Sequence, residues 1–290
     1  MTTAPSKAAL LREMLAGAGP VRAVGAHDAL TARLIEQAGF EAVWASSFAL
    51  SASHGVLDAG LLTMTQHLDA AEAMHAVTHI PVIADCDTGY GGPLNVAYAV
   101  QAYERRGIAA LCIEDKVFPK TNSFVDAAHD LVPTEEFVLK IRAGKAAQRG
   151  DDFMLIARTE TVISGGTVTQ ALDRCRAYAQ AGADAVLIHS KSHSPDEVIE
   201  FARCWDHPAS VVAVPTTYSG VAEKTLGDAG IGLVIYANQG LRAAIRALQG
   251  VFRELAEARC AAAVDNDDRI ASIREVFALQ SMPVPGEVWP

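Results

Sequence analysis

Acidic residues follow two short apolar segments in the first half of the chain. Asp85 and Asp87 end the segment PVIADCD, and Glu114 follows IAALCI. Residues two apart on a strand point to the same side, so we expect Asp85 and Asp87 to share a face. Carboxylates gathered in one place repel one another unless a cation lies among them. Because oxygen ligands suit a hard ion, these three acids predict a Mg²⁺ site; the alternative is that each acid caps a helix or pairs with a nearby base.

Basic residues that suit an anion follow other apolar segments. Arg158 lies near the end of FMLIARTE, His189 follows AVLI, and Lys120 lies in the polar segment after Glu114. A guanidinium group suits a carboxylate or phosphoryl group held by two parallel hydrogen bonds. The alternatives are a salt bridge from Arg158 to Glu160 or Glu114, and a histidine that only packs. With Mg²⁺, these residues predict a small dianionic or trianionic acid as substrate, phosphorylated or polycarboxylic, without specifying the reaction.

A repeated pattern predicts the elements that bring these residues together. An alanine-rich helix, a glycine and an apolar strand with a polar end recur in EQAGFEAVWASS, ERRGIAALCIED, AQAGADAVLIHS and GDAGIGLVIYAN. Further strands are expected at VRAVGAHD, PVIADCD, FMLIARTE and VVAVPTT. Alternating strands and helices form parallel sheets with right-handed crossovers, and these eight units predict an α/β fold, a (β/α)8 TIM-type barrel. A doubly wound open sheet is the alternative, but the first strand–helix turn lacks G-x-G-x-x-G.

We expect residues 1–290 to form a single barrel domain, with 251–290 as a C-terminal helical extension that packs on a neighbouring subunit. Segments 45–62 and 115–133 are the longest stretches without helical or strand periodicity. Both follow predicted strands, and barrel active sites lie at the C-terminal ends of the strands. The two segments are therefore predicted lids.

The overall charge and the cysteines limit the class of protein. The chain has 24 basic and 34 acidic residues, a formal net charge of −10. This excess of acids argues against a nucleic acid or an anionic membrane as partner. The five cysteines form no C-x-x-C pair, the N-terminus does not resemble a secretory signal, and no apolar run is long enough to span a bilayer. We expect a cytoplasmic protein.

The stretch EDKVFPKTNS, residues 114–123, resembles the signature of the phosphoenolpyruvate mutases in the phosphoenolpyruvate mutase/isocitrate lyase superfamily. ADCDTGYGG, SASHGVLD, ARTE, GADAVLIHSK and the YAN of the last strand resemble family segments in the same order. The resemblance implies a (β/α)8 barrel in a homotetramer, with the last barrel helix swapped between subunits. It also implies that Asp85 touches Mg²⁺ and that Asp58, Asp87 and Glu114 hold its water ligands.

The same resemblance implies roles for residues around the substrate. Those expected to be catalytic are Asp58, Lys120, Asn122, Arg158 and His189, with Lys120 in a gating loop. Those expected around the carboxylate and enolate of the substrate are Trp44, Ser46, Ser47 and Phe48, while Ser123 is expected beside the phosphoryl group with Asn122, Arg158 and His189. Three further polar strand ends, Glu160, Ser190 and Asn238, complete the predicted substrate-binding set.

The implied reaction moves a phosphoryl group between the enol oxygen and C3, which interconverts phosphoenolpyruvate and phosphonopyruvate and forms the P–C bond of phosphonates. A phosphonopyruvate hydrolase is the first alternative. The similar hydrolases carry Lys-Asp-Thr-Ser in the lid, whereas this chain has Lys120-Thr121-Asn122-Ser123, as in mutases. A carbon–carbon lyase or oxaloacetate decarboxylase, or a barrel without activity, is a more distant alternative. The Lys-Lys-Cys-Gly-His segment of the lyases does not occur, and all four acids of the expected metal site are present.

Overall fold

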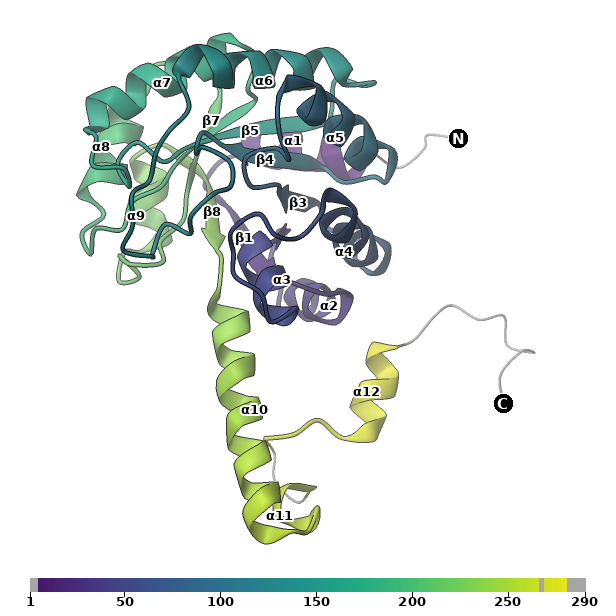
Figure 1. Ribbon diagram of the computed structural model, residues 1–290. Coiled ribbons are helices and arrows are strands. Elements are labelled where there is room, and N and C mark those ends of the chain that lie inside the picture. Colours follow the sequence, from purple (N-terminus) through teal and green to yellow (C-terminus); the bar gives the residue numbers. More distant parts are fainter. Residues whose placement is uncertain (1–4, 266–268, 281–290) are drawn as a thin grey trace. The chain divides into compact units, whose positions relative to one another are not determined.

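Eight parallel strands close into a barrel in the part of the chain that the computed structural model describes, residues 5–265 and 269–280 (Figure 1). They are β1 Val21–Ala26, β2 Ala42–Ala45, β3 Val82–Asp85, β4 Ala110–Glu114, β5 Met154–Thr159, β6 Ala185–Ile188, β7 Ser210–Ala213 and β8 Ile231–Tyr236. The strands follow one another around the barrel in chain order, and β1 closes it by pairing with β8, Val21 opposite Leu233. The predicted (β/α)8 fold is confirmed, and the doubly wound alternative is wrong because an open sheet has two edge strands, whereas here every strand pairs on both sides.

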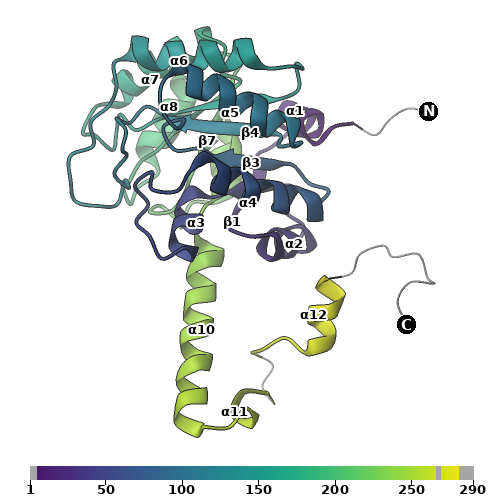
Figure 2. The ribbon, with the colours of Figure 1, turned by 45° about the vertical axis from the view of Figure 1, so that its right-hand side comes forward.

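Within residues 1–239, helices connect the strands and lie around the outside of the barrel (Figures 1 and 2). The helices are α1 Lys7–Ala16, α2 Ala29–Gln37, α3 Ser47–Ser53, α4 Met64–Val77, α5 Pro93–Arg105, α6 Thr134–Ala147, α7 Val168–Gln180, α8 Asp196–Cys204, α9 Glu223–Asp228, α10 Gln239–Ala258, α11 Ala262–Asp265 and α12 Ile273–Leu279. In both views α5 and α6 lie side by side, and they pack closely along their length.

Local sequence signals mark where helices begin and end. Thr167 caps α7 in a capping box with Gln170, and Pro93 is the first residue of α5. After α5 the chain reverses at Gly107, whose φ of 77° is a left-handed conformation that a side chain disfavours. These signals return the chain to the start of β4.

Two apolar clusters stabilise the barrel and its surrounding helices. One lies between the strands and the helices, and its fully buried members include Tyr103 and Phe137. The other fills the interior of the barrel with side chains such as Trp44, Ile83 and Leu187. Burial of these apolar side chains is the main favourable contribution to folding, and it leaves the polar groups at the strand ends.

The chain divides into two compact units, residues 1–239 and 240–290. In the second unit the exposed apolar side chains include Ile245, Leu248 and Phe252 of α10. The predicted extension begins within α10, and part of it, 266–268 and 281–290, lies outside the described residues. Its packing on a neighbouring subunit stays a prediction. Among the described residues, no helix combines the length and apolarity needed to cross a membrane.

Gly25 tests the closure of the barrel. A Cβ added to this β1 residue would lie 1.9 Å from the carbonyl oxygen of Ala237, a backbone atom that cannot move independently of the strand. We expect Gly25→Ala to cost about 3 kcal/mol and to lower Tm by about 6–12 °C in a thermal unfolding experiment. The control is Gly232→Ala in β8, where the nearest atom, Ser210 Cβ, is 3.5 Å away. Equal Tm values for the two variants would contradict this account.

Candidate active site

Parallel strands place the predicted site residues at one end of the barrel. Asp85 and Glu114 are the last residues of β3 and β4, and Arg158 lies opposite Glu114 near the end of β5. His189 directly follows β6, and Asn238 lies beyond β8. The carboxyl ends of all the strands meet at this mouth, which is where barrel enzymes bind their substrates.

Asp85 and Asp87 come together, although not through the alternation of a strand. β3 ends at Asp85, and Asp87 has a φ of 50°, a left-handed turn conformation. The turn is fixed by the N–H of Glu114, which donates to the Asp87 carbonyl at 2.7 Å. Ser47 donates its hydroxyl to Asp85 Oδ2 at 2.7 Å. The expectation that a continuous strand carries both aspartates is therefore wrong, because the backbone turns between them.

The ammonium group of Lys120 lies among these carboxylates. Its Nζ is 2.6 Å from Asp87 Oδ1 and 2.9 Å from Asp58 Oδ1, and it donates to Ser47 Oγ at 3.3 Å. Burial alone would lower the pKa of Lys120, but Asp87 and the other acids raise it well above its ordinary value. Lys120 therefore stays charged and neutralises part of the acidic cluster.

Both predicted lids meet at Asp58. Asn122 donates Nδ2–H to Asp58 Oδ2 at 2.6 Å, and its Oδ1 accepts from the N–H of Phe124. Asp58 lies in segment 45–62, whereas Lys120 and Asn122 lie in segment 115–133. The two segments, the first of which includes α3, thus meet through contacts between a carboxylate and two donors, and Lys120 is only 6% exposed.

Burial also perturbs the pKa of the carboxylates at the strand ends. It raises the pKa of Glu114 to about 7, although Arg158, with Nε 3.3 Å from Glu114 Oε2, acts in the opposite direction. It raises the pKa of Asp85 as well, against the effect of Lys120. Burial would also raise the pKa of Asp87, but the positive charge of Lys120 keeps it below its ordinary value.

Arg158 and His189 share a buried carboxylate. Glu160 Oε1 accepts from Arg158 Nε at 2.6 Å and lies 2.8 Å from His189 Nδ1. A carboxylate only accepts, so His189 Nδ1 carries the proton in this contact and cannot also accept from Arg158 Nη2 at 2.9 Å. Burial lowers the pKa of His189, so a neutral imidazole is favoured. Burial would raise the pKa of Glu160, but the cations around it hold it well below its ordinary value.

The structure gives three of the predicted substrate-binding residues different partners. Glu160 has both oxygens occupied by protein donors, so it positions Arg158 and His189 and leaves no free acceptor. Ser123 donates its hydroxyl to Glu160 Oε2 at 2.5 Å and does not point a hydrogen at a ligand. Ser190 donates to Glu197 of α8. Glu160, Ser123 and Ser190 could contact a substrate directly only if these hydrogen bonds were first broken.

The remaining predicted residues line the mouth to different degrees. Ser46 caps α3 by accepting from the N–H of Ala49, and Trp44 is buried inside the barrel. Phe48 of α3 is 39% exposed. Asn238 is buried, and its Oδ1 has no hydrogen-bond partner among the described residues, which leaves an acceptor for a ligand or water.

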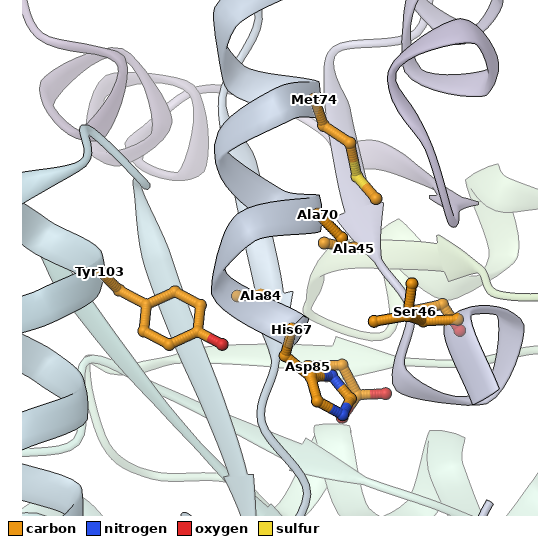
Figure 3. Close-up of a pocket in the computed structure, with 9 residues that line it drawn as sticks. Ala45, Ser46, His67, Ala70, Met74, Ala84, Asp85 and Tyr103 are labelled. Atoms are coloured by element: carbon orange, nitrogen blue, oxygen red, sulfur yellow. The ribbon is translucent and has the colours of Figure 1, made fainter. Parts of the chain in front are cut away.

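Sequence reasoning missed a set of residues behind the site. Lys116 and Asp115 are fully buried in the segment after β4, and Asp115 accepts from Arg174 and Tyr178 of α7. The available signal was that two charged residues, Asp115 and Lys116, directly follow Glu114 at the end of an apolar strand. From the sequence, a role is assigned to Glu114 alone. His67 of α4 was also passed over; it lines a small cavity with Asp85 and Ser46 (Figure 3).

The charges of the mouth leave room for a divalent cation. When ionised, the carboxylates outnumber the cations by two: Asp58, Asp85, Asp87, Glu114 and Glu160 against Lys116, Lys120 and Arg158. Glu114 Oε1 is buried without a hydrogen-bond partner among the described residues, and Asp58 Oδ1 and Asp87 Oδ1 have the Lys120 ammonium as their neighbour. Across residues 5–265 and 269–280, no group of three histidine, cysteine or acidic side chains is arranged as a ready metal site, and the Lys120 ammonium contacts both Asp58 and Asp87. The oxygen donors fit a hard cation held partly through water.

Comparison with known proteins identifies the family of this barrel. Residues 11–256 match the model of the family described as phosphoenolpyruvate phosphomutase. A crystal structure of phosphoenolpyruvate phosphomutase from Streptomyces platensis subsp. rosaceus superposes with a TM-score of 0.92 at 49% identity, over 94% of each chain. Phosphonopyruvate hydrolase from Variovorax sp. (strain Pal2) is 42% identical over 89% of each chain. A phosphonopyruvate hydrolase structure in complex with oxalate and Mg²⁺ superposes with a TM-score of 0.88 at 40% identity, over 95% of each chain.

The barrel, the acidic mouth and these similarities agree. The chain is an enzyme that belongs to the phosphoenolpyruvate phosphomutase family, within the phosphoenolpyruvate mutase/isocitrate lyase superfamily.

Proposed function

We propose that the protein is a Mg²⁺-dependent phosphoenolpyruvate mutase, which interconverts phosphoenolpyruvate and phosphonopyruvate by moving a phosphoryl group within one molecule. The observation that carries the proposal is the seated lid, in which Lys120 and Asn122 both contact Asp58 at the mouth. A phosphoryl group in transfer reacts with water unless water is excluded, so a covered mouth suits transfer to carbon.

Mg²⁺ would be held by Asp85, with Asp58, Asp87 and Glu114 holding its water ligands, and it would supply charge stabilisation for the enolate oxygen and carboxylate. The oxalate and Mg²⁺ complex of the hydrolase relative supports this cofactor. When all five carboxylates are ionised they exceed the three cations by two negative charges, and a divalent ion among them would favour that ionised state.

The residues of the chain position the reacting groups. Arg158 lies 3.3 Å from Glu114 and contacts Glu160, so its guanidinium is oriented in a buried place where a phosphoryl group needs charge neutralisation. His189 Nδ1 donates to Glu160, so Nε2 of the neutral imidazole is an acceptor, and it would donate to a phosphoryl oxygen once the ring takes up a proton beside the bound anion. Phosphoryl transfer depends on such positioning more than on proton transfer.

Phosphonopyruvate hydrolysis is the second candidate, supported by the 42% identity of the Variovorax hydrolase. The Thr121-Asn122 pair favours the mutase, because the hydrolases that the chain resembles carry Asp-Thr at these positions. The homotetramer and the cytoplasmic location stay predictions.

The reaction is tested by phosphorus NMR of the protein with phosphonopyruvate and Mg²⁺. We expect a growing phosphoenolpyruvate signal with no early inorganic phosphate, because the equilibrium favours phosphoenolpyruvate. Phosphate and pyruvate as first products would establish the hydrolase instead. An unchanged spectrum would contradict both activities.

Asn122→Ala tests the role of the lid residue that contacts Asp58. The variant loses the bond to Asp58 Oδ2, so we expect phosphoenolpyruvate formation to fall by about 10²-fold or more. Thr121→Ala is the matched control, since the contact that the structure gives Thr121 is made by its backbone carbonyl. If both variants have nearly wild-type rates, Asn122 does not steer the transfer.

Asp85→Asn tests the metal site without a substrate. An ion at about 100 times its Kd stabilises a folded protein by about 2.7 kcal/mol, so Mg²⁺ should raise the Tm of the wild type by several degrees. We expect the variant to lose most of this shift. Asp126→Asn, in an exposed part of the lid, should keep it. A full Mg²⁺ shift in Asp85→Asn would show that the ion binds elsewhere.

A further inference from the structure

We propose that Lys116 is a positioning residue that joins the lid to the anion-binding residues. It thereby determines whether the phosphoryl group passes from C3 to the enolate oxygen or to water. The proposal rests on the proposed function. It assigns a role to a residue that lies outside the predicted catalytic, substrate-binding and metal sets.

The ammonium group of Lys116 is saturated by protein acceptors. Its Nζ donates to the carbonyl of Thr121 at 2.8 Å and to Ser123 Oγ at 2.7 Å, and it lies 3.0 Å from Glu160 Oε2. An ammonium has three hydrogens, and the three partners account for all of them. Lys116 is 2% exposed, so water cannot replace a partner that is lost. A buried charge satisfied in this way holds its neighbours in a single arrangement.

The two acceptors in the lid lie on either side of Asn122. The base of the lid is closed by backbone bonds, from the N–H of Val117 to the Asp130 carbonyl and from the N–H of Val132 to the Asp115 carbonyl. These bonds hold only the two ends of the loop. Lys116 reaches from the base into the loop and binds the turn that carries Asn122. It therefore sets the place from which the Asn122 amide reaches Asp58.

A relay continues from the lid to the anion-binding residues. Ser123 Oγ accepts from Lys116 and donates to Glu160 Oε2 at 2.5 Å. The other oxygen of Glu160 orients Arg158 and His189. The Phe124 ring also lies edge-on to His189, with centroids 5.9 Å apart. Closure of the lid and orientation of the guanidinium and imidazole are thus parts of the same hydrogen-bonded unit.

Loss of Lys116 has a defined chemical consequence. With the lid turn released, water reaches the phosphorus atom of phosphonopyruvate. The water oxygen then forms the new P–O bond, the P–C bond breaks with its electron pair passing to the pyruvate enolate, and the enolate takes up a proton at C3. The products are phosphate and pyruvate in place of phosphoenolpyruvate.

Lys116→Met and Lys116→Gln test the proposal in the full-length protein with phosphonopyruvate and Mg²⁺, followed by phosphorus NMR. We expect the ratio of phosphate to phosphoenolpyruvate to rise at least tenfold, while total P–C cleavage falls less than phosphoenolpyruvate formation does. Lys145→Met is the matched control. It removes the ion pair of a lysine with Asp184, 2.7 Å apart, before the start of β6 and away from the mouth, and it should keep the wild-type ratio.

Hydrogen exchange of the lid gives a second readout that does not depend on the reaction. Amides of residues 117–130 should exchange at least tenfold faster in both Lys116 variants, with α6 unchanged. Ser123→Ala breaks the relay at its next member, and its effect on lid exchange should not add to that of Lys116→Met.

If the wild type itself yields only phosphate or is inert, the proposed mutase activity fails and lid exchange alone decides the role of Lys116. Lid exchange at the wild-type rate in the Lys116 variants, or a wild-type product ratio in a protein that makes phosphoenolpyruvate, would overturn the proposal. If both Lys116 variants fail to fold, Ser123→Ala decides by the same readouts.

Discussion

The concentration of negative charge at the mouth of the barrel is the constraint on which the other features of the site depend. Asp85 and Glu114 lie at adjacent strand ends, and Asp87 and Asp58 lie close by. Carboxylates buried together are stable only with positive charge among them. In this structure the charge comes from Lys120, which the lid carries, so the lid is also the counterion of the cluster. A bound divalent cation would share the same carboxylates, which couples metal binding to the position of the lid.

A second layer of buried polar groups holds the first in place. Asp115 accepts from the N–H of Glu160 at 2.9 Å and from Arg174 and Tyr178 of α7. This ties the end of β5 to the end of β4, so the Glu160 carboxylate faces Arg158. Such a network is stable because its donors and acceptors are paired, and removal of a member leaves a buried group without a partner. Rigid support of this kind is what phosphoryl transfer requires of a protein.

The similarity to both mutases and a hydrolase has a structural reason. Under the proposed function, strand ends that neutralise a phosphoryl group and acids that hold Mg²⁺ would serve either reaction, because both cleave the P–C bond of phosphonopyruvate. The outcome depends on which nucleophile meets the phosphoryl group, the enolate oxygen or water. We propose that the lid makes this choice, since Lys116, Lys120 and Asn122 bond to Glu160 and Asp58. On this proposal, the difference between the two activities lies in a short loop and its contacts.

The sequence by itself predicted the alternation of strands and helices, the glycine stops such as Gly107, and the end of the barrel at which the polar residues gather. These features follow from propensities and periodicities that operate within about a dozen residues. It also indicated Asp85, Glu114, Arg158 and Lys120 as parts of one site, since parallel strands carry their carboxyl ends to the same edge. Resemblance to a family added Asp58 and Asn122, which no local pattern singles out.

Tertiary structure alone decided which of these groups touch. The left-handed turn at Asp87 is held by the hydrogen bond from the N–H of Glu114. Lys116 points inward because Glu160 and Ser123 supply acceptors for its ammonium group. Ser123 and Glu160 turned out to bond to each other. Contacts between residues far apart in the chain depend on the packing of whole elements and on the balance of charge among them. A local pattern contains neither, so the partners of a buried charge are determined only when the chain is folded.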